Sequence, residues 1–416
     1  MATGIDLALS CSAISDDAIL LSAHVTEAIS EPTRATVVFL ATTDIDGEAV
    51  VGQPATLTFL HEGKPFRHFQ LVAAGFTFDA LVGESRRRYV LDLTHELRLL
   101  SLRSDVRIFQ EKDAKQIITE VIEGAGLDPA HYTFSLRRTP PTRVYDVQYR
   151  ETDLDYVSRL AEHEGIFYFA NDDDASSHVT FGDNQSVFEP IDEDVLTVVD
   201  DDEHGDGISD LVVEEKVIPK SCTVADYNFE TPAYDLRSTQ ETGLPTAGDY
   251  FEYTASFQKP DEGTALAKIR AEEQAAAQCV ARGRTERRSV RAGGTFRLEG
   301  ADRDALNTKY LITAVRHRVV VRAETGAEGR THYENKLTAI PHDRAYRPPR
   351  RAPHPKMGGV HAAVVTGPAG SEIHTEDLGR MKAQSSGSRR RERRHEARRG
   401  CASISSRCPD PWPSRA

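Results

Sequence analysis

Two helix patterns interrupt a chain that otherwise reads as strands, and this interruption constrains the fold most. Both lie within residues 107–170, and each leads toward strand-like sequence. In the first, Asp113 is placed to cap a helix, with Gln116 as its reciprocal partner three residues on. One apolar helix face follows at Ala114, Ile117, Ile118, Val121 and Ile122. Gly124 and Gly126 end this helix, because glycine adopts the left-handed turn at little cost.

The second helix pattern repeats this logic. Thr152 and Asp155 are the capping pair, and Gly165 is the stop. Residues 166–169, Ile-Phe-Tyr-Phe, are rich in β-branched and aromatic types and predict a strand. The predicted buried stripe consists of Leu154, Val157, Leu160 and Ala161. On this evidence residues 101–195 form a compact α/β insertion with no obvious chemistry.

Strand patterns flank the insertion on both sides. Residues 1–100 contain short alternating or apolar runs, such as 5–9, 37–40 and 56–60, separated by turn signals. Tyr89, Leu91 and Leu93 are expected to face one side of a strand. Residues 196–345 resume the β pattern around one long Ala-rich helix, predicted over 262–284. The sequence therefore predicts an α+β, mainly β fold.

Charge and composition narrow the function classes. The 416 residues carry a formal charge of −14, which argues against nucleic acid as the main partner. The N-terminal residues lack a basic region before their apolar run, and no stretch reaches the ~18–20 apolar residues of a membrane helix. The five cysteines are scattered at Cys11, Cys222, Cys279, Cys401 and Cys408, which favours thiols in a reducing compartment. We expect a chain made in the cytoplasm, with no membrane insertion.

No candidate catalytic, cofactor or metal site emerges from the motifs. Glu162-His163-Glu164 closes the second helix, but adjacent helical side chains diverge, so surface charge is favoured over an ion site. The pairs His61-Glu62 and His95-Glu96 are expected to be isolated. The acidic runs 171–174 and 200–203 lack the ligand spacing of a calcium loop and are predicted to be solvated. No hydrolase, nucleotide-binding or zinc-protease motif occurs.

Two ordered segments of the insertion resemble a known family. The segments FQEKDAKQIITEVIEGAGL and VQYRETDLDYVSRLAEHEGIFYF are similar to the core signature of VgrG proteins, the trimeric spikes of type VI secretion systems. The runs 293–298 and 309–317 resemble the strands of that family's second hub barrel. Gly300 is followed by Ala301-Asp302 where the family often has His-Pro. His317 and His374 lie in segments that match the family's framework, so neither is assigned a catalytic role.

The resemblance implies an architecture and partners. It implies two hub-type β-barrels, at 1–100 and 196–345, and a homotrimer whose six barrels form a pseudo-sixfold ring. That ring would dock on the hexameric tube protein Hcp and contact baseplate subunits. A PAAR tip and effectors would bind only through the family's needle. The chain is expected to assemble in the cytoplasm and leave through the secretion apparatus.

Two other functions stay open. One is the hub of a phage-tail-like contractile particle, and the other is a remnant of an effector-bearing VgrG enzyme. We expect no enzyme activity, because the 32 residues after residue 384 are too few for a catalytic domain.

The C-terminal part departs from the family pattern. Residues 346–356 read as a Pro/Arg linker, and 357–384 resemble the start of an OB-fold that stops at Gln384. Nine arginines against three acids give residues 385–416 a formal charge of +6, and their composition predicts disorder. One hypothesis is out-of-frame translation, because Phe-Leu-Trp codons read one base later give Ser-Ser-Gly, as at 385–387. A genuine basic tail is the alternative. We expect a monomer or weak trimer, poorly ordered beyond about residue 345.

Overall fold

The computed structural model describes most of the chain before residue 357. The described residues are 4–15, 17–83, 85–172, 176–199, 207–243, 247–321, 331–356, 358, 362–368, 375, 381–385 and 402–404. The chain divides into two compact units. The larger unit comprises Met1–Arg98, Leu127–Thr139 and Ala161–Arg350, and the smaller unit comprises Leu99–Gly126, Pro140–Leu160 and Arg351–Ala416.

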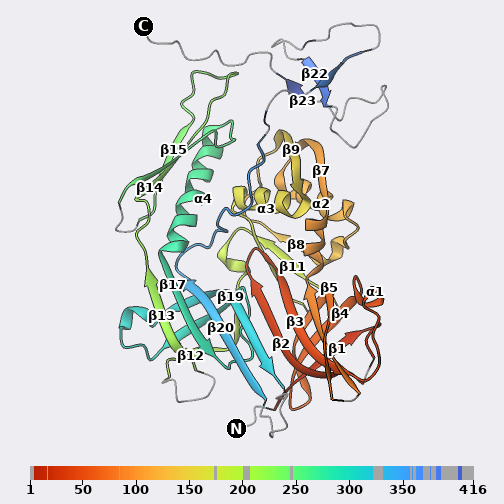
Figure 1. Cartoon of the computed structure of the whole chain (residues 1–416). Helices are drawn as coiled ribbons and strands as arrows, with labels where there is room; N and C mark the ends of the chain where they lie inside the picture. The colour runs from red at the N-terminus through yellow and green to blue at the C-terminus, as the bar shows by residue number, and fades with distance from the viewer. Residues whose placement is uncertain are drawn as a thin grey trace, which may run out of the picture. The chain divides into compact units, whose positions relative to one another are not determined.

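One twelve-stranded sheet dominates the larger unit (Figure 1). Its main path runs β1-β4-β5-β6-β3-β2-β19-β20-β17-β13, and β18 joins β19 to β12. All its neighbours are antiparallel except the β12–β18 pair. Its strands are β1 Ile5–Cys11, β2 Ile19–Ala28, β3 Glu31–Ala41, β4 Pro54–His61, β5 Lys64–Val82, β6 Arg86–Thr94, β12 Glu189–Thr197, β13 Ser209–Glu215, β17 Cys279–Thr285, β18 Gly294–Glu299, β19 Lys309–Val320 and β20 His332–Pro341.

The two predicted β regions meet at one strand pair. β2, from the first region, pairs with β19, from the second, between Ala28↔Ala314 and Ser22↔Val320. Figure 1 shows these two strands side by side. The mainly β, α+β class is confirmed, and the two regions share one continuous sheet. Their closure into two barrels stays a prediction.

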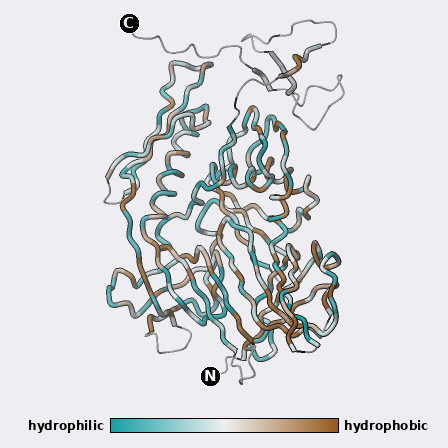
Figure 2. The backbone as a smooth tube through the Cα atoms, viewed as in Figure 1, coloured by the Kyte–Doolittle hydropathy of each residue, from teal (hydrophilic) through white to brown (hydrophobic). Residues whose placement is uncertain are grey.

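The apolar core follows the strands of this sheet, as the brown stretches of Figure 2 show. Tyr89, Leu91 and Leu93 are buried together on β6, as their spacing predicts. A second cluster around Phe296, Tyr310 and Val315 fills the region of β18 and β19. Alternation with period two therefore gave the correct inward face of β6.

Two smaller sheets complete the larger unit. One has the order β10-β11-β8, formed by Phe167–Ala170, Val179–Gly182 and Tyr132–Ser135. The other has the order β15-β14-β16, formed by Arg237–Glu241, Ser221–Ala225 and Asp249–Tyr253. The helix α4, Pro260–Gln278, packs on this second sheet through a cluster that includes Val224, Phe257 and Leu266. A short helix α1, Gly47–Val50, follows β3.

The predicted helix over 262–284 is too long. α4 ends at Gln278, and Cys279–Thr285 forms β17. Cys279, Ala281, Gly283 and Thr285 are buried in alternation, which is the period of a strand. β17 pairs with β13 and β20 on its two sides, so a tertiary ladder determines its conformation.

The smaller unit contains the paired strands β7, Ser104–Lys112, and β9, Arg143–Thr152, and the helix α2, Ala114–Gly124. The helix α3, Asp153–Glu164, begins in this unit. The α2 capping box is confirmed: Asp113 accepts from the Gln116 N–H at 2.8 Å, and Gln116 accepts from the Asp113 N–H at 3.0 Å. The expected buried face of α2 is confirmed in full.

The described C-terminal segments correct two expectations. Residues 346–356, expected to be poorly ordered, are described, and 344–350 make side-chain bonds within the larger unit. In the smaller unit, β22 Met381–Ser385 pairs with β21 Ala363–Thr366 and with β23 Ala402–Ile404. Part of the segment predicted to be disordered is therefore a strand, because backbone pairing needs no apolar side chains. The rest of that tail, the run 200–203 and His374 lie outside the described residues.

Candidate functional site

The acidic end of α3 is buried, which corrects the expectation of surface charge. Glu162 and Glu164 are both buried, and the Glu164 carboxylate pairs with Arg138 at 2.5 Å. The His163 carbonyl accepts a hydrogen bond from Arg270 at 3.3 Å. Glu164 and residue 163 therefore serve separate contacts, with Arg138 and Arg270. Among the described residues, no group of three or more His, Cys, Asp or Glu side chains is arranged to hold a metal ion.

His95 is not isolated, contrary to expectation, but belongs to a buried chain of hydrogen bonds. Its Nε2 lies 2.6 Å from the Ser177 Oγ, and the Ser177 hydroxyl donates to Asp172 at 3.1 Å. Asp172 also accepts from the Gln70 N–H at 2.9 Å. Burial raises the pKa of Asp172 and lowers the pKa of His95. Asp172 is thus no solvated loop acid, and the cluster ties the loop after β10 to β5 and β6.

The order of the three groups differs from that of a catalytic Ser-His-Asp triad. The His95 Nδ1 accepts from the Leu97 N–H at 3.1 Å, so the proton of the neutral ring lies on Nε2. That proton points at the Ser177 Oγ, and a ring nitrogen that donates to the hydroxyl cannot remove its proton. His95 and Ser177 are also buried, with 1% and 5% of their surfaces exposed. We therefore assign this cluster a structural role.

A second buried cluster lies at the β2–β19 pair, and we call it the seam. The Glu27 carboxylate, on β2, accepts from Arg67 at 2.6 Å and contacts the His317 Nε2 at 2.9 Å. The His317 Nδ1 lies 2.7 Å from the Asn335 Oδ1, and Asn335 donates to the Arg287 carbonyl at 2.8 Å. The seam thus joins β2 and β5 of the first region to β19 and β20 of the second.

Electrostatics holds the Glu27 carboxylate in its charged form. Burial alone would raise its pKa, but Arg67 and the hydrogen bond from His317 outweigh burial, and the net pKa lies below its ordinary value. The rings of Phe59 and Phe69 stand edge-on to His317, at 6.1 and 5.9 Å between centroids. These rings exclude water and strengthen the charge interactions.

A third cluster fixes the segment 344–350, which we call the strap. Three arginines spaced three residues apart bind α4. Arg344 donates to the Gln278 side chain, and Arg347 binds Glu272 at 2.7 Å. Arg347 also donates to the carbonyls of Gly165 and Asp183, at 2.9 and 2.6 Å. Arg350 pairs with Glu273 of α4 at 3.3 Å, and it also binds Glu252 at 2.8 Å and the Tyr250 hydroxyl at 2.7 Å on β16. Residues 346–350, the first part of the predicted linker, therefore belong to the larger unit.

Arg270 anchors the strap from the helix side. It is fully buried on α4 and binds Glu252 at 3.0 Å, so Glu252 lies between Arg270 and Arg350. Burial would raise the pKa of Glu252, but the two guanidinium groups hold it below its usual value. Two cations around one carboxylate make a local network in which each group is paired.

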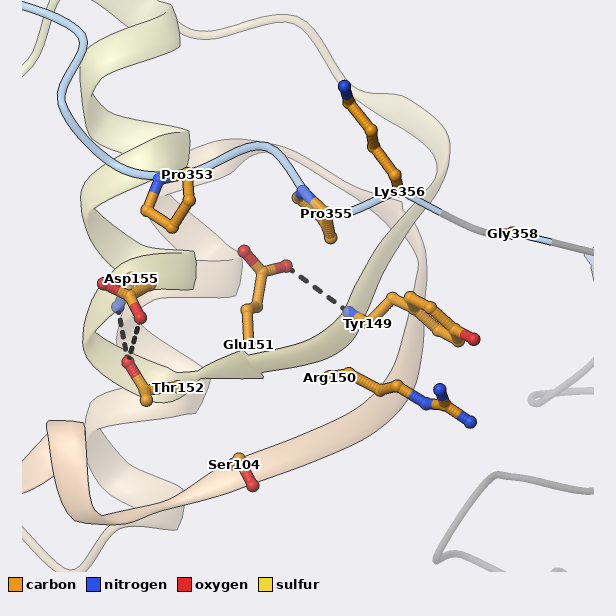
Figure 3. A pocket seen from close by; sticks show the side chains of 10 residues that line it. All are labelled: Ser104, Tyr149, Arg150, Glu151, Thr152, Asp155, Pro353, Pro355, Lys356 and Gly358. Carbon is orange, nitrogen blue, oxygen red and sulfur yellow. Dashed lines mark hydrogen bonds between the residues drawn. The ribbon is translucent and has the colours of Figure 1, made fainter.

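A pocket of about 470 Å³ lies in the smaller unit at the start of α3 (Figure 3). Its polar groups already have partners: Thr152 and Asp155 cap the helix, and Glu151 binds Arg159 at 2.8 Å. Glu151 also accepts from the Tyr149 N–H at 3.4 Å. The capping role predicted for Thr152 and Asp155 is confirmed. The pocket is lined by Ser104, Tyr149, Arg150, Glu151, Thr152, Asp155, Pro353, Pro355, Lys356 and Gly358, which suggest no reaction.

Cys11, Cys222 and Cys279 are free and buried. Burial raises the pKa of the Cys222 thiol to about 11, which keeps it protonated and unreactive at neutral pH. Cys401 and Cys408 lie outside the described residues. Within the described part of the chain, no helix has both the length and the apolar character needed to cross a bilayer.

Comparison with known proteins identifies the family. Residues 26–323 match the family model described as phage tail baseplate hub (GPD). The type VI secretion system spike protein VgrG5 of Pseudomonas aeruginosa is 33% identical over 388 residues, which cover 86% of this chain and 47% of that protein. The chain belongs to the VgrG family. It spans about half the length of the curated VgrG relatives that it matches.

Solved structures agree on the fold. An E. coli type VI secretion component, described as similar to the phage T4 tail proteins gp27 and gp5, superposes with a TM-score of 0.71 at 22% identity, covering 91% of this chain and 88% of that one. A chain of the Francisella PdpA–VgrG complex superposes with a TM-score of 0.58 at 7% identity, covering 96% and 72%. The VgrG resemblance of the sequence is confirmed by the sequence relatives, and the superpositions confirm the fold.

Sequence reasoning missed the seam and the strap. Arg270, four residues after Leu266 on the apolar stripe of α4, was a visible signal of a buried ion pair. The regular spacing of Arg344, Arg347 and Arg350 was another. Their partners are distant in sequence, so the spacing alone could not name them.

Proposed function

We propose that this VgrG-family chain works as the hub of a type VI secretion spike. The match to the baseplate hub family over residues 26–323 carries the proposal. The hub function is mechanical: the chain would link the secreted tube to the baseplate. The seam supports this role, because a buried network across β2 and β19 makes the two β regions resist relative movement.

In this proposal, the two β regions close into two hub-type barrels, and three chains present six of them. A pseudo-sixfold ring of this kind matches the symmetry of a hexameric tube ring of Hcp, the partner that the family resemblance implies. Baseplate subunits would contact the outside of the trimer. A PAAR tip and effectors would bind through needle segments of the kind that longer relatives have. Assembly would occur in the cytoplasm, before the spike leaves through the apparatus.

The decisive experiment is a titration of the purified chain with Hcp rings, followed by sedimentation velocity. We expect a complex of three chains per Hcp hexamer. The chain alone is expected to be a monomer or weak trimer, and its self-association should strengthen when Hcp is added. Absence of any complex at concentrations where Hcp hexamers persist would contradict the proposal.

The hub of a phage-tail-like particle is the second candidate, because the matching family model is itself that of a phage baseplate hub. Neighbouring genes separate the two functions. A secretion locus encodes Hcp and an assembly ATPase, whereas a particle locus encodes tail-fibre genes.

We also propose that this chain has no enzyme activity of its own. The burial of His95 and Ser177 supports this, because a substrate cannot reach the serine hydroxyl, and the His95 ring donates to that hydroxyl and cannot act as its base. A panel of hydrolase substrates should therefore give no turnover. Turnover that is abolished by Ser177→Ala would instead favour an effector-type function.

A further inference from the structure

The three-stranded sheet β15-β14-β16 has one face that is not packed on α4, and we call it the outer face. Strand register defines it, because residues paired directly across strands lie on the same side. Thr223 pairs with Thr239 and Phe251, and Ala225 pairs with Arg237 and Tyr253. The outer face consists of Ser221, Thr223, Ala225, Arg237, Thr239, Glu241, Asp249, Phe251 and Tyr253.

Large aromatic side chains are exposed on this face and beside it. Phe251 and Tyr253 have 55% and 61% of their surfaces exposed. The loop 226–236 closes the same end of the sheet through the Asp226 N–H to Leu236 carbonyl bond of 2.9 Å. That loop adds exposed Tyr227, Phe229 and Tyr234. Clustered exposed aromatics mark interaction surfaces, and tyrosine is enriched in them.

The charge on this part of the chain is strongly negative. Residues 221–253 contain six acids and one arginine, and one of the acids, Glu252, is already paired with Arg270 and Arg350. Glu241 and Asp249 lie on the outer face, and Glu230 and Asp235 are exposed in the adjoining loop. Arg237 reaches over the Phe251 ring, with its guanidinium carbon 5.9 Å from the ring centroid. The Phe251 ring thus accepts a guanidinium group on its face, and an arginine of a partner would replace Arg237 there.

We propose that the outer face is a docking surface for a basic, extended polypeptide segment of a partner protein. Arginine side chains of that segment stack on Phe251 and Tyr253 and pair with Glu241 and Asp249. The central strand has only short side chains on this face, of which Ser221 and Ala225 are buried and Thr223 is half-buried, so the exposed contacts come from the two flanking strands. This surface belongs to the separate three-stranded sheet and not to the twelve-stranded sheet that joins the two β regions, and the inference does not depend on trimer formation.

Charge argues against other occupants. In a twofold contact, a second copy of this face would bring Glu241 and Asp249 against identical acids, which is unfavourable. Nucleic acid is excluded from this face by the same negative charge, because its binding requires neutralised phosphates. A basic segment is the occupant whose charge complements both the acids and the aromatic rings.

The test measures binding of fluorescein-labelled peptides to the full chain by anisotropy. The probes are six-fold repeats of Arg-Val, Lys-Val and Glu-Val. We expect the arginine peptide to bind most tightly, the lysine peptide several-fold more weakly, and the glutamate peptide not at all. Two double variants, Phe251→Ser with Tyr253→Ser and Glu241→Gln with Asp249→Asn, should each weaken arginine-peptide binding at least tenfold.

Matched controls separate this surface from the general negative charge of the chain. Tyr145→Ser removes a comparably exposed aromatic residue, and Glu299→Gln with Asp302→Asn removes two exposed acids elsewhere. Both control variants should bind the arginine peptide as the unmodified chain does. Equal loss in the controls, no binding of the arginine peptide, or self-association that Phe251→Ser abolishes would overturn the proposal. The amide variant keeps side-chain volume, so it remains informative if the serine variant unfolds.

Discussion

The seam and the strap are both networks of buried charge, but they differ in what else holds their parts together. At the seam, the β2–β19 ladder joins the same two regions that Glu27 and His317 connect. The strap belongs to no helix or strand, so side-chain bonds from Arg344, Arg347 and Arg350 attach it to α4. Loss of a buried charge at the seam should therefore lower the free energy of unfolding of the whole larger unit. Loss of a strap arginine should instead allow residues 344–350 to open locally.

The largest effect is expected at the seam. Glu27→Ala leaves Arg67 and His317 buried without their shared carboxylate, and breaking such a network costs about 3–5 kcal/mol. Urea unfolding of the variant should show this loss across the whole larger unit. The matched control Glu299→Gln, an exposed acid on β18, should change stability by less than about 0.5 kcal/mol. If Glu27→Ala is as stable as that control, the seam does not stabilise the larger unit globally, and the proposed difference from the strap is wrong.

The strap should respond locally. Arg347→Ala removes charged hydrogen bonds to Glu272 and to two carbonyls, each worth about 1.5–3 kcal/mol. We expect faster amide exchange and protease cleavage within 344–350, with a smaller change in the global unfolding midpoint. Arg282→Ala breaks an exposed pair with Glu214 and serves as the control, with an expected cost below about 1 kcal/mol. Global unfolding with no local opening would contradict this account.

The His95 cluster should give an intermediate, pH-dependent effect. The pKa of His95 is lowered in the folded chain. As pH falls, His95 therefore takes up a proton in the unfolded chain at a higher pH than in the folded chain. The stability that neutral His95 contributes is present above about pH 6.5 and is lost as pH falls toward the folded pKa. Asp172, whose pKa is raised, acts in the opposite direction at lower pH. His95→Gln should flatten the stability profile between pH 7.5 and 5.5, measured by urea unfolding; an unchanged slope would exclude His95 as its source.

The smallest effect is expected in the smaller unit. Asp113→Ala removes the N-cap of α2 and should cost about 1 kcal/mol. Amide exchange in the first turn of α2 should accelerate, while exchange in the large sheet stays unchanged. Glu123→Gln, exposed near the other end of the helix, should have little effect. Destabilisation of both units by Asp113→Ala would show that they do not unfold separately.

Local signals in the sequence predicted local structure well. Asp113 with Gln116, and Thr152 with Asp155, gave both helix starts, because each cap needs partners only three residues away. The predicted end of the long helix was wrong, because pairing of β17 with β20 outweighs the helix propensity of residues 279–284. Glu27 and His317 are 290 residues apart in sequence, and no local pattern predicts such a pair. The charged clusters were therefore missed for one shared reason, which is the sequence distance between their members.

The hub function itself rests on family membership and on a continuous sheet, so stoichiometry tests it most directly. We would measure the mass of the complex that forms when this chain is mixed with purified Hcp rings, by native mass spectrometry. The account predicts three chains bound to one hexameric ring, with the complex weakened by Glu27→Ala and retained by Glu299→Gln. A stoichiometry of one chain per Hcp subunit, or no complex with folded Hcp, would contradict it.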